Sequence, residues 1–358
     1  MTEQFQINEF ALGKLFRPYI IAEIGVNHGG DLDTAKQLVD DAREAGAHAA
    51  KFQTYKADKI ATKDSPAYWD TSAEATSTQH ALFQKYDQFG EQQYIELATH
   101  CQAVGIDFLS TPFDLEAADF LAPLMPMYKI ASADITNVPL IRRCASHGKP
   151  MVLSTGASTE EEIHRAVSEA TAHGAEYVAL LHCILNYPTR ITLAQLGYIE
   201  VLKKQFNGHP IGYSDHVVPD VTLSALQLAT LMGCQILEKH FTYDKNLAGN
   251  DHYHAMDKHD LAAFNQSLSL FRELYGDGEK DLSHEKKAIL HARRSIVAAT
   301  KIFAGEELSE KNMIAKRPGH GISPTHWDEL LGAIASQDIE TDELIGWHQI
   351  AKAEPGDT

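Results

Sequence analysis

The amino-acid sequence predicts a (β/α)₈ barrel, a TIM barrel, over roughly residues 19–275, followed by a small strand-rich domain. Within this range, eight short apolar runs alternate with segments of helical periodicity. Strands of a parallel barrel are covered on both faces, so they read as nearly continuous apolar runs. Polar residues gather at the end of every run, where barrel active sites form. An open doubly wound sheet is the alternative, but its G-x-G-x-x-G loop is absent from EIGVNHGGD, which ends the first run.

The eight expected strands can be followed in order along the chain. They are YIIAEIG from Tyr19, HAAKFQ from His48, DFLSTPF from Asp107, MYKIAS from Met127, PMVLSTG from Pro150, YVALLHC from Tyr177, PIGYSDH from Pro210 and ILEKHFT from Ile236. Two of the helices between them have clear end signals. The first has Asp31 as its N-cap and Gly46 at its C-terminal end, and the second covers residues 159–174.

Two segments depart from the strand–helix alternation. Residues 54–90 form an unusually long second connection that contains SPAYWD and STQHALFQKY, and such a length at the active-site rim is typical of a lid or a substrate wall. Later, GDGEKDLSHEKK has the composition of a charged linker. These features predict a catalytic barrel over residues 1–280, a linker over 281–291 and a small strand-rich domain over 292–358.

Composition and charge exclude several classes of function. The chain has 358 residues and a formal net charge of −18, which disfavours a nucleic-acid surface because phosphate binding needs clustered Lys and Arg. Its four cysteines form no C-x-x-C pair, as is typical of reduced, buried thiols. The sequence has no signal-peptide pattern and no apolar run of the ~18 residues that a membrane helix needs. We therefore expect a cytoplasmic protein without nucleic-acid or membrane partners.

Two lysines in apolar strands point to an anion site. Lys51 and Lys129 lie on barrel strands, although lysine is rarely buried without a partner. Hydroxyl side chains occupy matching positions on other strands, namely Thr111, Ser132, Ser154 and Ser214. Together these groups suit a small anion such as a phosphate ester that also bears a carboxylate. Alternatively, each lysine pairs with a barrel carboxylate such as Glu23 or Glu238.

Histidines at the ends of neighbouring strands favour a metal site. His216 and His240 end the seventh and eighth strands, so their imidazoles can approach each other at the barrel mouth. Glu238 or a substrate oxygen could complete the coordination. Because the chain has 19 histidines, chance placement competes with this interpretation. His28, His252 and His254 are alternative ligands.

The sequence contains no strong nucleophile signal. The cysteines lie in apolar or helical contexts, and there is no G-x-S-x-G motif. A metal that activates an electrophile, in a basic pocket lined by hydroxyls, is typical of lyase, aldolase or condensing chemistry.

Several long motifs resemble the sialic acid synthase family. IAEIGVNHGGDLDTAKQLVDDAREAGAHAAKFQTYKA resembles the opening of that family, and STPFD, YKIASADITNVPLI, GKPMVLSTGAST, LHCILNYPT, IGYSDH and EKHFT follow in its order. The tail, with ARRSIVAATKIFAGEELSEKNM and KRPGHGIS, resembles the family's antifreeze-like (SAF) domain. The likeness covers about residues 17–350.

The resemblance implies a reaction and an assembly. Members of the family condense phosphoenolpyruvate with an N-acetylated hexose, giving a nonulosonic acid and phosphate. The expected sugar is N-acetylmannosamine or a di-N-acetylated 6-deoxy hexose, and the expected cofactor is a divalent metal, usually Mn²⁺, with Mg²⁺ or Co²⁺ as alternatives. The expected assembly is a homodimer that exchanges its SAF domains. A metal-dependent aldolase or hydrolase with another sugar substrate is the alternative function, and a carbohydrate-binding or ice-binding protein is a more distant one.

The resemblance also implies roles for individual residues. The catalytic groups match Glu23, Lys51 and Lys129. The groups that hold phosphoenolpyruvate match Lys51, Thr111, Lys129, Ser132, Ser154 and Ser214. The sugar-site groups match Glu23, Gln53, Tyr187, Asp251 and Arg317, of which Arg317 would come from the partner's SAF domain. The two metal ligands match His216 and His240.

The sequence departs from the family pattern on the sugar side. Leu185 stands where the family often has Asn, and in an extended segment Asn186 would face away from the side shared by Leu185 and Tyr187. His320 stands where sialic acid synthases usually have Asn, and SPAYWD differs from the segment of typical N-acetylmannosamine users. The phosphoenolpyruvate side retains its pattern, so the identity of the sugar is the open question.

Overall fold

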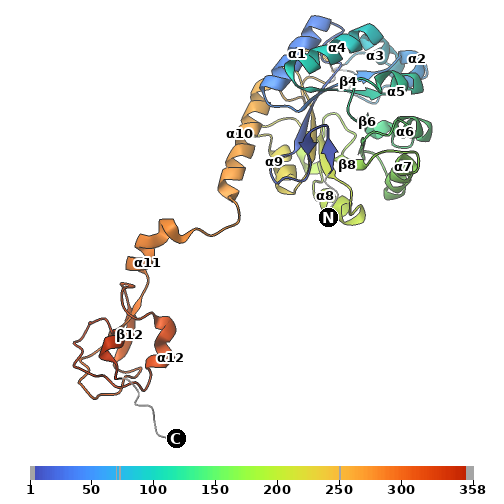
Figure 1. The fold of residues 1–358 in the computed structure, drawn as a ribbon. Coiled ribbons are helices and arrows are strands. Elements are labelled where there is room, and N and C mark those ends of the chain that lie inside the picture. The colour runs from blue at the N-terminus through green and yellow to red at the C-terminus, as the bar shows by residue number, and fades with distance from the viewer. Residues whose placement is uncertain (1–4, 70, 72–73, 250, 352–358) are drawn as a thin grey trace. The chain divides into compact units, whose positions relative to one another are not determined.

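A computed structural model describes residues 5–69, 71, 74–249 and 251–351 (Figure 1). The chain divides into two compact units, Met1–Tyr275 and Gly276–Thr358, each with its own hydrophobic core. The first unit is an eight-stranded parallel sheet rolled into a nearly closed barrel, and the second is a small domain with an antiparallel strand pair. The predicted fold class, a (β/α)₈ barrel followed by a small strand-rich domain, is confirmed.

The barrel strands follow one another around the sheet in sequence order. They are β3 (Tyr19–Gly25), β4 (Ala49–Thr54), β5 (Asp107–Pro112), β6 (Tyr128–Ile130), β7 (Met151–Ser154), β8 (Val178–Cys183), β9 (Ile211–Asp215) and β10 (Ile236–His240). The first strand pairs in parallel with the last, with Glu23 opposite His240. Glu23 also lies opposite Lys51 on β4. Because parallel neighbours keep their ends level, this register brings the polar strand ends to one rim.

Helices cover the outside of the barrel (Figure 1). They are α1 (Leu32–Glu44), α4 (Glu91–Val104), α5 (Leu115–Leu121), α6 (Val138–Ala145), α7 (Glu160–Ala172), α8 (Tyr198–Gln205), α9 (Ser224–Leu231) and α10 (Lys258–Tyr275). Asp31 caps α1 by accepting a hydrogen bond from the Thr34 amide at 2.7 Å, as predicted. Thr159 caps α7 in a capping box with Glu162.

A short hairpin that the sequence analysis did not anticipate precedes the first barrel strand. It consists of β1 (Gln6–Ile7) and β2 (Phe10–Ala11), which pair antiparallel. Ile7 is fully buried in the barrel core, and Asn8 donates a hydrogen bond to Asp107 at the start of β5. The hairpin therefore contacts the amino-terminal ends of the strands, opposite the rim that bears the predicted site.

The second unit is a small domain with its own apolar core. It contains η3 (Leu282–Glu285), α11 (Lys286–Ala292), β11 (Ser295–Ala298), β12 (Met313–Lys316), η4 (Pro324–His326), α12 (Trp327–Leu330) and η5 (Trp347–Gln349). Its core is built from Ile296, Ala298, Ile302, Leu308, Met313, Ile322, Leu330, Ala335, Ile339 and Ile345. The segment expected as a linker, residues 281–291, is mostly helical and has no buried residue.

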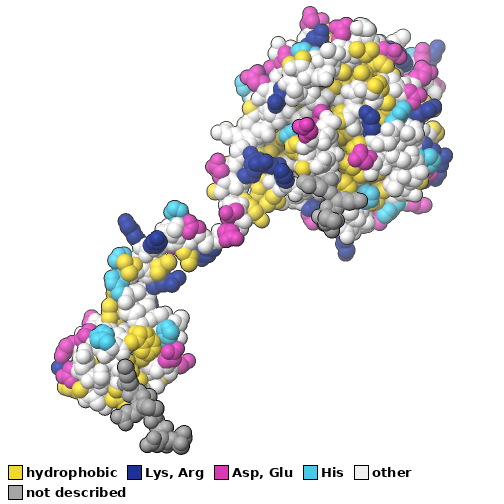
Figure 2. All heavy atoms as spheres, in the orientation of Figure 1, with side chains coloured by type: hydrophobic (Ala, Val, Ile, Leu, Met, Phe, Trp, Pro, Cys, Tyr) yellow, Lys and Arg dark blue, Asp and Glu magenta, His cyan; other side chains and the backbone are white. Residues whose placement is uncertain are grey.

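Charged side chains of both signs lie on the visible surface of the barrel (Figure 2), and this agrees with the composition of the chain. On the visible face of the barrel, Lys and Arg side chains are interspersed with Asp and Glu (Figure 2). In the described part of the chain, no helix is both long enough and apolar enough to cross a membrane.

Candidate active site

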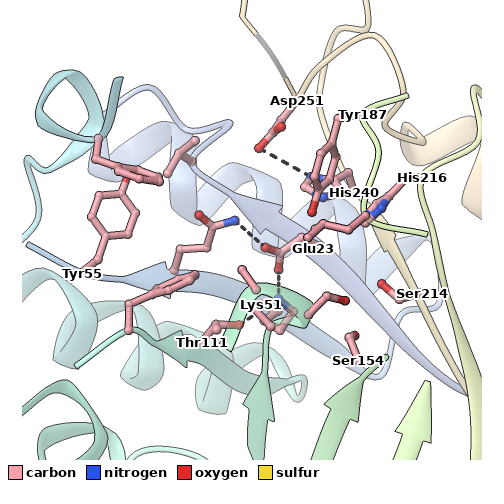
Figure 3. A pocket seen from close by; sticks show the side chains of 18 of the residues that line it. Glu23, Lys51, Tyr55, Thr111, Ser154, Tyr187, Ser214, His216, His240 and Asp251 are labelled. Carbon is pink, nitrogen blue, oxygen red and sulfur yellow. Dashed lines mark hydrogen bonds and ion pairs between the residues drawn. The ribbon is translucent and has the colours of Figure 1, made fainter. Parts of the chain in front are cut away.

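A cavity of about 490 Å³ opens among the carboxyl ends of the barrel strands (Figure 3). It is lined by every predicted site residue that belongs to the barrel. These are Glu23, Lys51, Gln53, Thr111, Lys129, Ser132, Ser154, Tyr187, Ser214, His216, His240 and Asp251. Arg317 lies in the other compact unit, on the loop after β12. The barrel topology thus brings together groups that are more than 200 positions apart in sequence.

The two cavity lysines form a buried network with two carboxylates. The Lys51 ammonium lies 2.5 Å from a Glu23 oxygen and 3.6 Å from a Glu238 oxygen. Lys129 lies 3.3 Å from the other Glu238 oxygen, and Lys51 also donates a hydrogen bond to the Thr111 hydroxyl at 3.1 Å. Both lysines are therefore ion-paired, as the alternative interpretation expects, and both also line the cavity.

The four charged groups of this network have different proton affinities. Burial would lower the pKa of Lys51, but Glu23 and Glu238 hold it above its ordinary value. Burial lowers the pKa of Lys129, and the neighbouring Lys51 adds to this effect. Burial raises the pKa of Glu23, whereas Lys129 and Lys51 outweigh burial and keep the pKa of Glu238 low. An incoming anion beside Lys129 would oppose the lowering of its pKa and favour its charged form.

Hydroxyl groups line the same part of the cavity. Ser214 donates a hydrogen bond to Glu238 at 2.9 Å, and Ser132 accepts one from the Gly156 amide at 3.0 Å. The buried Ser154 hydroxyl has no hydrogen-bond partner among the described residues. Buried hydroxyls are normally satisfied, so the Ser154 hydroxyl is a donor available to a ligand.

Gly156 contributes to this arrangement through its lack of a side chain. A Cβ at this position would lie 2.8 Å from the Ser132 hydroxyl and 2.9 Å from the Leu185 amide nitrogen. Only glycine lets the β7 loop approach these groups so closely.

Three imidazoles, His216, His240 and His254, converge beside another part of the cavity, and the first two of them line it. The ring centroid of His240 lies 5.4 Å from that of His216 and 4.8 Å from that of His254, while His216 and His254 are 6.2 Å apart. An Asp251 oxygen lies 3.7 Å from Nδ1 of His240 (Figure 3). The Tyr187 ring packs against His216 at 4.2 Å.

The donor set of this cluster fits a divalent metal ion. His216 Nδ1 lies 2.8 Å from the Ile184 carbonyl, and donation to it leaves Nε2 as the ligand atom. Nδ1 of His240 is buried and has no hydrogen-bond partner among the described residues. Burial, together with His254 and His216, keeps the pKa of His240 far below its ordinary value, so its ring is neutral and has a free lone pair. Imidazole and carboxylate ligands together suit transition ions.

A second set of side chains that could hold a metal ion differs from the predicted ligand pair of His216 and His240. Among the described residues, His240, Asp251 and His254 have donor atoms that all lie within 4.8 Å of one another. His254 is one of the alternative ligands expected from the sequence. Its signal was weak because His254 follows the last strand by 14 positions, in a loop whose course no periodicity predicts.

The long connection after β4 forms an aromatic wall of the cavity, as predicted for a substrate wall. It includes α2 (Ala57–Ile60) and α3 (Gln79–Tyr86), and it contributes Tyr55, Ile60, Tyr68, Trp69, Leu82, Phe83 and Tyr86 to the lining. Trp69 donates a hydrogen bond from its indole to the Glu74 carbonyl at 3.1 Å, and the Glu74 carboxylate pairs with Lys85 at 2.9 Å. Asp70, the last residue of SPAYWD, lies outside the described residues.

In the segment after β8, successive side chains alternate between the cavity and the outside, as predicted for an extended segment. Leu185 and Tyr187 line the cavity, whereas Asn186 is exposed and does not. Cys183, which the sequence analysis treated as an ordinary buried thiol, also lines it, with Sγ 3.8 Å from Nδ1 of His216. Its position at a strand end was the available signal.

The fold and the site together define a barrel enzyme whose cavity carries charged, hydroxyl and imidazole groups at the carboxyl ends of its strands. Residues 38–280 match the model of the NeuB family, and residues 293–351 match that of the SAF domain. The chain therefore belongs to the NeuB family and carries a SAF domain.

Proteins that are similar to this chain over nearly its whole length support this assignment to the family. The chain is 37% identical over 342 residues to N,N′-diacetyllegionaminic acid synthase of Legionella pneumophila, covering 93% of this chain and 94% of the relative. It is 38% identical over 332 residues to the enzyme of the same name from Campylobacter jejuni, covering 91% and 98%. The crystal structure of N-acetylneuraminic acid (sialic acid) synthetase from Leptospira borgpetersenii superposes with a TM-score of 0.69 at 32% identity, covering 81% of this chain and 96% of that one. The expected membership of the sialic acid synthase family is confirmed, and the protein is an enzyme of the synthase class.

Proposed function

We propose that the protein condenses phosphoenolpyruvate with an N-acetylated hexose to give a nonulosonic acid and phosphate. The observation that carries this proposal is one cavity that holds two buried lysines, Lys51 and Lys129, the unsatisfied hydroxyl of Ser154 and a cluster of imidazoles. The cations and the hydroxyl suit an anionic phosphate ester, and the imidazoles suit a divalent metal ion. The names of the synthases that the chain resembles support the same reaction.

Phosphoenolpyruvate would be held by the lysine network. Its phosphate and carboxylate groups need cationic and hydroxyl donors together. Lys51 supplies a fixed positive charge, and Lys129 would become more firmly protonated as the anion enters. The predicted hydroxyl donors to the same ligand are Thr111, Ser132, Ser154 and Ser214.

The reaction forms one carbon–carbon bond, and at C2 it replaces the carbon–oxygen bond to phosphate with a carbon–oxygen bond to a water oxygen. The methylene carbon C3 of phosphoenolpyruvate attacks the aldehyde carbon of the open-chain sugar, and the aldehyde oxygen takes a proton. Water adds to the cationic C2 and loses a proton, and phosphate then leaves with the bridging oxygen. Glu23 is suited to hold a proton during these steps, because burial raises its pKa and Gln53 and Lys51 fix its carboxylate.

We assign the metal to His216 and His240, with Mn²⁺ as the proposed ion and Mg²⁺ or Co²⁺ as alternatives. When bound, a divalent ion supplies Lewis acidity at the sugar carbonyl. His216 is held for this role by the Ile184 carbonyl, and His240 by its place at the end of β10. Asp251 lies beside His240 on the sugar side of the cavity.

The aromatic wall supports a sugar with apolar substituents. A di-N-acetylated 6-deoxy hexose presents three methyl groups, whereas N-acetylmannosamine presents one. Methyl groups gain from contact with the rings of Tyr55, Trp69 and Phe83, which line the cavity. We therefore place the di-N-acetylated 6-deoxy hexose first and N-acetylmannosamine second.

An assay with both sugars tests the reaction. Purified protein with phosphoenolpyruvate and Mn²⁺ is expected to release phosphate only when a sugar is added, and to form a product whose mass is that of both substrates plus water minus phosphoric acid. EDTA and Lys129→Met are each expected to abolish release. Lys36→Met, at a surface ion pair with Glu96, serves as the matched control. Release without sugar would indicate a phosphatase and contradict the proposal.

The proposal includes a homodimer in which the SAF domain of one subunit brings Arg317 to the partner's cavity. Leu270, Leu274 and Tyr275 near the end of α10 are more than half exposed, which supports a surface that a second subunit covers. We also place the enzyme in the cytoplasm, supported by four buried cysteines that are not paired in disulfides.

A further inference from the structure

The loop that follows β10 is fixed to the barrel at both sides of His254. Asn27 donates hydrogen bonds to the Phe241 carbonyl at 3.0 Å and to the Asp251 carbonyl at 3.4 Å. The Met256 amide donates to the His240 carbonyl at 2.8 Å, and the Thr242 amide donates to the Met256 carbonyl at 3.0 Å. These bonds hold the returning chain against the end of β10, and they place the fully buried His254 beside the His240 ring.

The distances in this cluster suit a single ion. For an ion bound at about 2.1 Å, each imidazole centroid lies about 3.2 Å away, so centroids of two ligands are separated by roughly 4.5–6.3 Å. His216, His240 and His254 have centroid separations of 4.8, 5.4 and 6.2 Å, all within that range. The donor atoms of His240, Asp251 and His254 lie within 4.8 Å of one another, close to the ~4.2 Å that separates two opposite ligand atoms of one ion.

A buried polar atom in the same cluster points independently to a ligand. Nδ1 of His240 makes no hydrogen bond within the described part of the chain, although the residue is only 6% exposed. Its nearest acidic group, Asp251, lies at 3.7 Å, which exceeds hydrogen-bond length. A metal ion between these side chains would satisfy both.

We propose that His254 is a third imidazole ligand of the metal, with Asp251 as the carboxylate ligand, around the ion assigned to His216 and His240. The inference rests on the metal assistance proposed above. It defines a nitrogen-rich site, and such a site binds Co²⁺ and Zn²⁺ more tightly than Mn²⁺ and Mg²⁺. His254 therefore determines which metals the enzyme retains.

Metal binding without either substrate tests this inference. Metal-free wild-type protein is titrated with Co²⁺ and with Mn²⁺, and calorimetry gives the affinities while visible absorption reports the Co²⁺ ligand field. His254→Ala and the bulkier His254→Gln are expected to weaken Co²⁺ binding by about 100-fold and Mn²⁺ binding by about tenfold. Both variants are also expected to change the Co²⁺ spectrum, because one nitrogen ligand is lost.

Two further variants make the result decisive. His252→Ala alters the same loop at a ring that contacts the Thr242 hydroxyl and lies outside the ligand group, so its Co²⁺ affinity and spectrum should match the wild type. His240→Ala removes a ligand of the proposed function and should weaken both metals. If both His254 variants fold, as judged by circular dichroism, and bind Co²⁺ like the wild type while His240→Ala does not, the inference is overturned and the proposed metal site stands. If the wild type binds neither metal, the metal assistance itself is wrong.

Discussion

At the scale of residues, the chemistry of the site depends on how buried charges are shared. Glu238 contacts both Lys51 and Lys129, whereas the Glu23 carboxylate lies against Lys51. Burial lowers the pKa of both lysines, and the ion pairs of Lys51 with Glu23 and Glu238 outweigh it, whereas the attraction of Glu238 for Lys129 does not. An added dianion would compete with Glu238 for both cations.

Replacing Lys51 with methionine tests this charge balance. Lys51→Met removes a charged donor and leaves Glu23 and Glu238 without its ammonium, so we expect phosphoenolpyruvate affinity to fall by about 100-fold, or ~3 kcal/mol. Calorimetric titration with phosphoenolpyruvate measures the change. Unaltered affinity, with Lys36→Met also unaltered, would show that Lys51 has only a structural role.

Much of the site at this scale could be predicted, for physical reasons. Lys51 and Lys129 were noticeable because charged residues rarely interrupt apolar strands, and strand ends meet at one rim. That Glu23 faces Lys51 could not be predicted without the strand register. His254 was left open as a ligand, and the rings that the connection after β4 turns to the cavity could not be named, because loop courses depend on tertiary contacts.

At the scale of elements, the strands pack without spare volume at several points. Gly212 on β9 is an example, since a Cβ there would lie 2.2 Å from the Ile236 carbonyl oxygen and 2.5 Å from a Leu181 methyl carbon. A Cβ added at Gly197, just before α8, would meet no atom within 4 Å apart from its chain neighbours. The two glycines therefore differ in packing, although both occur in the barrel unit.

Gly212→Ala is expected to destabilise the barrel by about 2–3 kcal/mol, because β9 and β10 must move apart to admit the methyl group. Gly197→Ala should leave the free energy of unfolding nearly unchanged. Urea unfolding followed by fluorescence measures both. Equal stability of the two variants would contradict the close packing described for β9.

The entrance to α9 offers a pH-dependent test. The Asp220 carboxylate accepts hydrogen bonds from the amides of Thr222 and Ser224 at 2.9 and 3.0 Å and contacts both hydroxyls. Although partial burial raises it, these bonds lower the pKa of Asp220 to about 2. A lowered pKa contributes stability that is complete above the ordinary value and is lost as the pH falls through about 2.

Asp220→Ala should therefore lower the free energy of unfolding at pH 7 by about 1 kcal/mol, an amount limited by solvent exposure. The difference from the wild type should shrink as the pH is lowered from 4 to 3. Urea midpoints across this range measure it, with Asp220→Asn as a control that retains an acceptor but does not titrate. A difference that grows on acidification would contradict the assigned hydrogen bonds.

Some helices and strands could be predicted from the sequence, and others could not. The barrel strands and the Asp31 cap were predictable because apolar runs and capping residues are local signals. The hairpin of β1 and β2 was not, since two-residue strands carry no periodicity. The helix α11 lies in a segment whose charged composition had suggested a linker.

At the scale of the whole molecule, the proposed domain exchange separates the parts of one active site between two chains. Lys51 belongs to the barrel unit and Arg317 to the small unit. In a mixed dimer of Lys51→Met and Arg317→Ala subunits, domain exchange places both lesions at one site and leaves the other site intact. Without exchange, every site carries one lesion.

Refolding or coexpressing the two inactive variants in equal amounts tests the exchange. Half of the dimers would be mixed, and each would have one intact site of two, so about a quarter of wild-type activity is expected. Activity no higher than that of the separate variants, with mixed dimers verified by mass, would contradict the exchanged arrangement.

The fate of the bridging oxygen of phosphoenolpyruvate tests the central claim of condensation most directly. The proposed reaction breaks the bond between C2 and this oxygen after water adds to C2. With ¹⁸O at the bridging position, the protein, Mn²⁺ and the preferred hexose should yield phosphate that carries the label and a nonulosonic acid that does not. Labelled pyruvate in place of a nonulosonic acid would mean that the phosphorus–oxygen bond breaks without condensation, as in a phosphatase, and would contradict the proposed condensation.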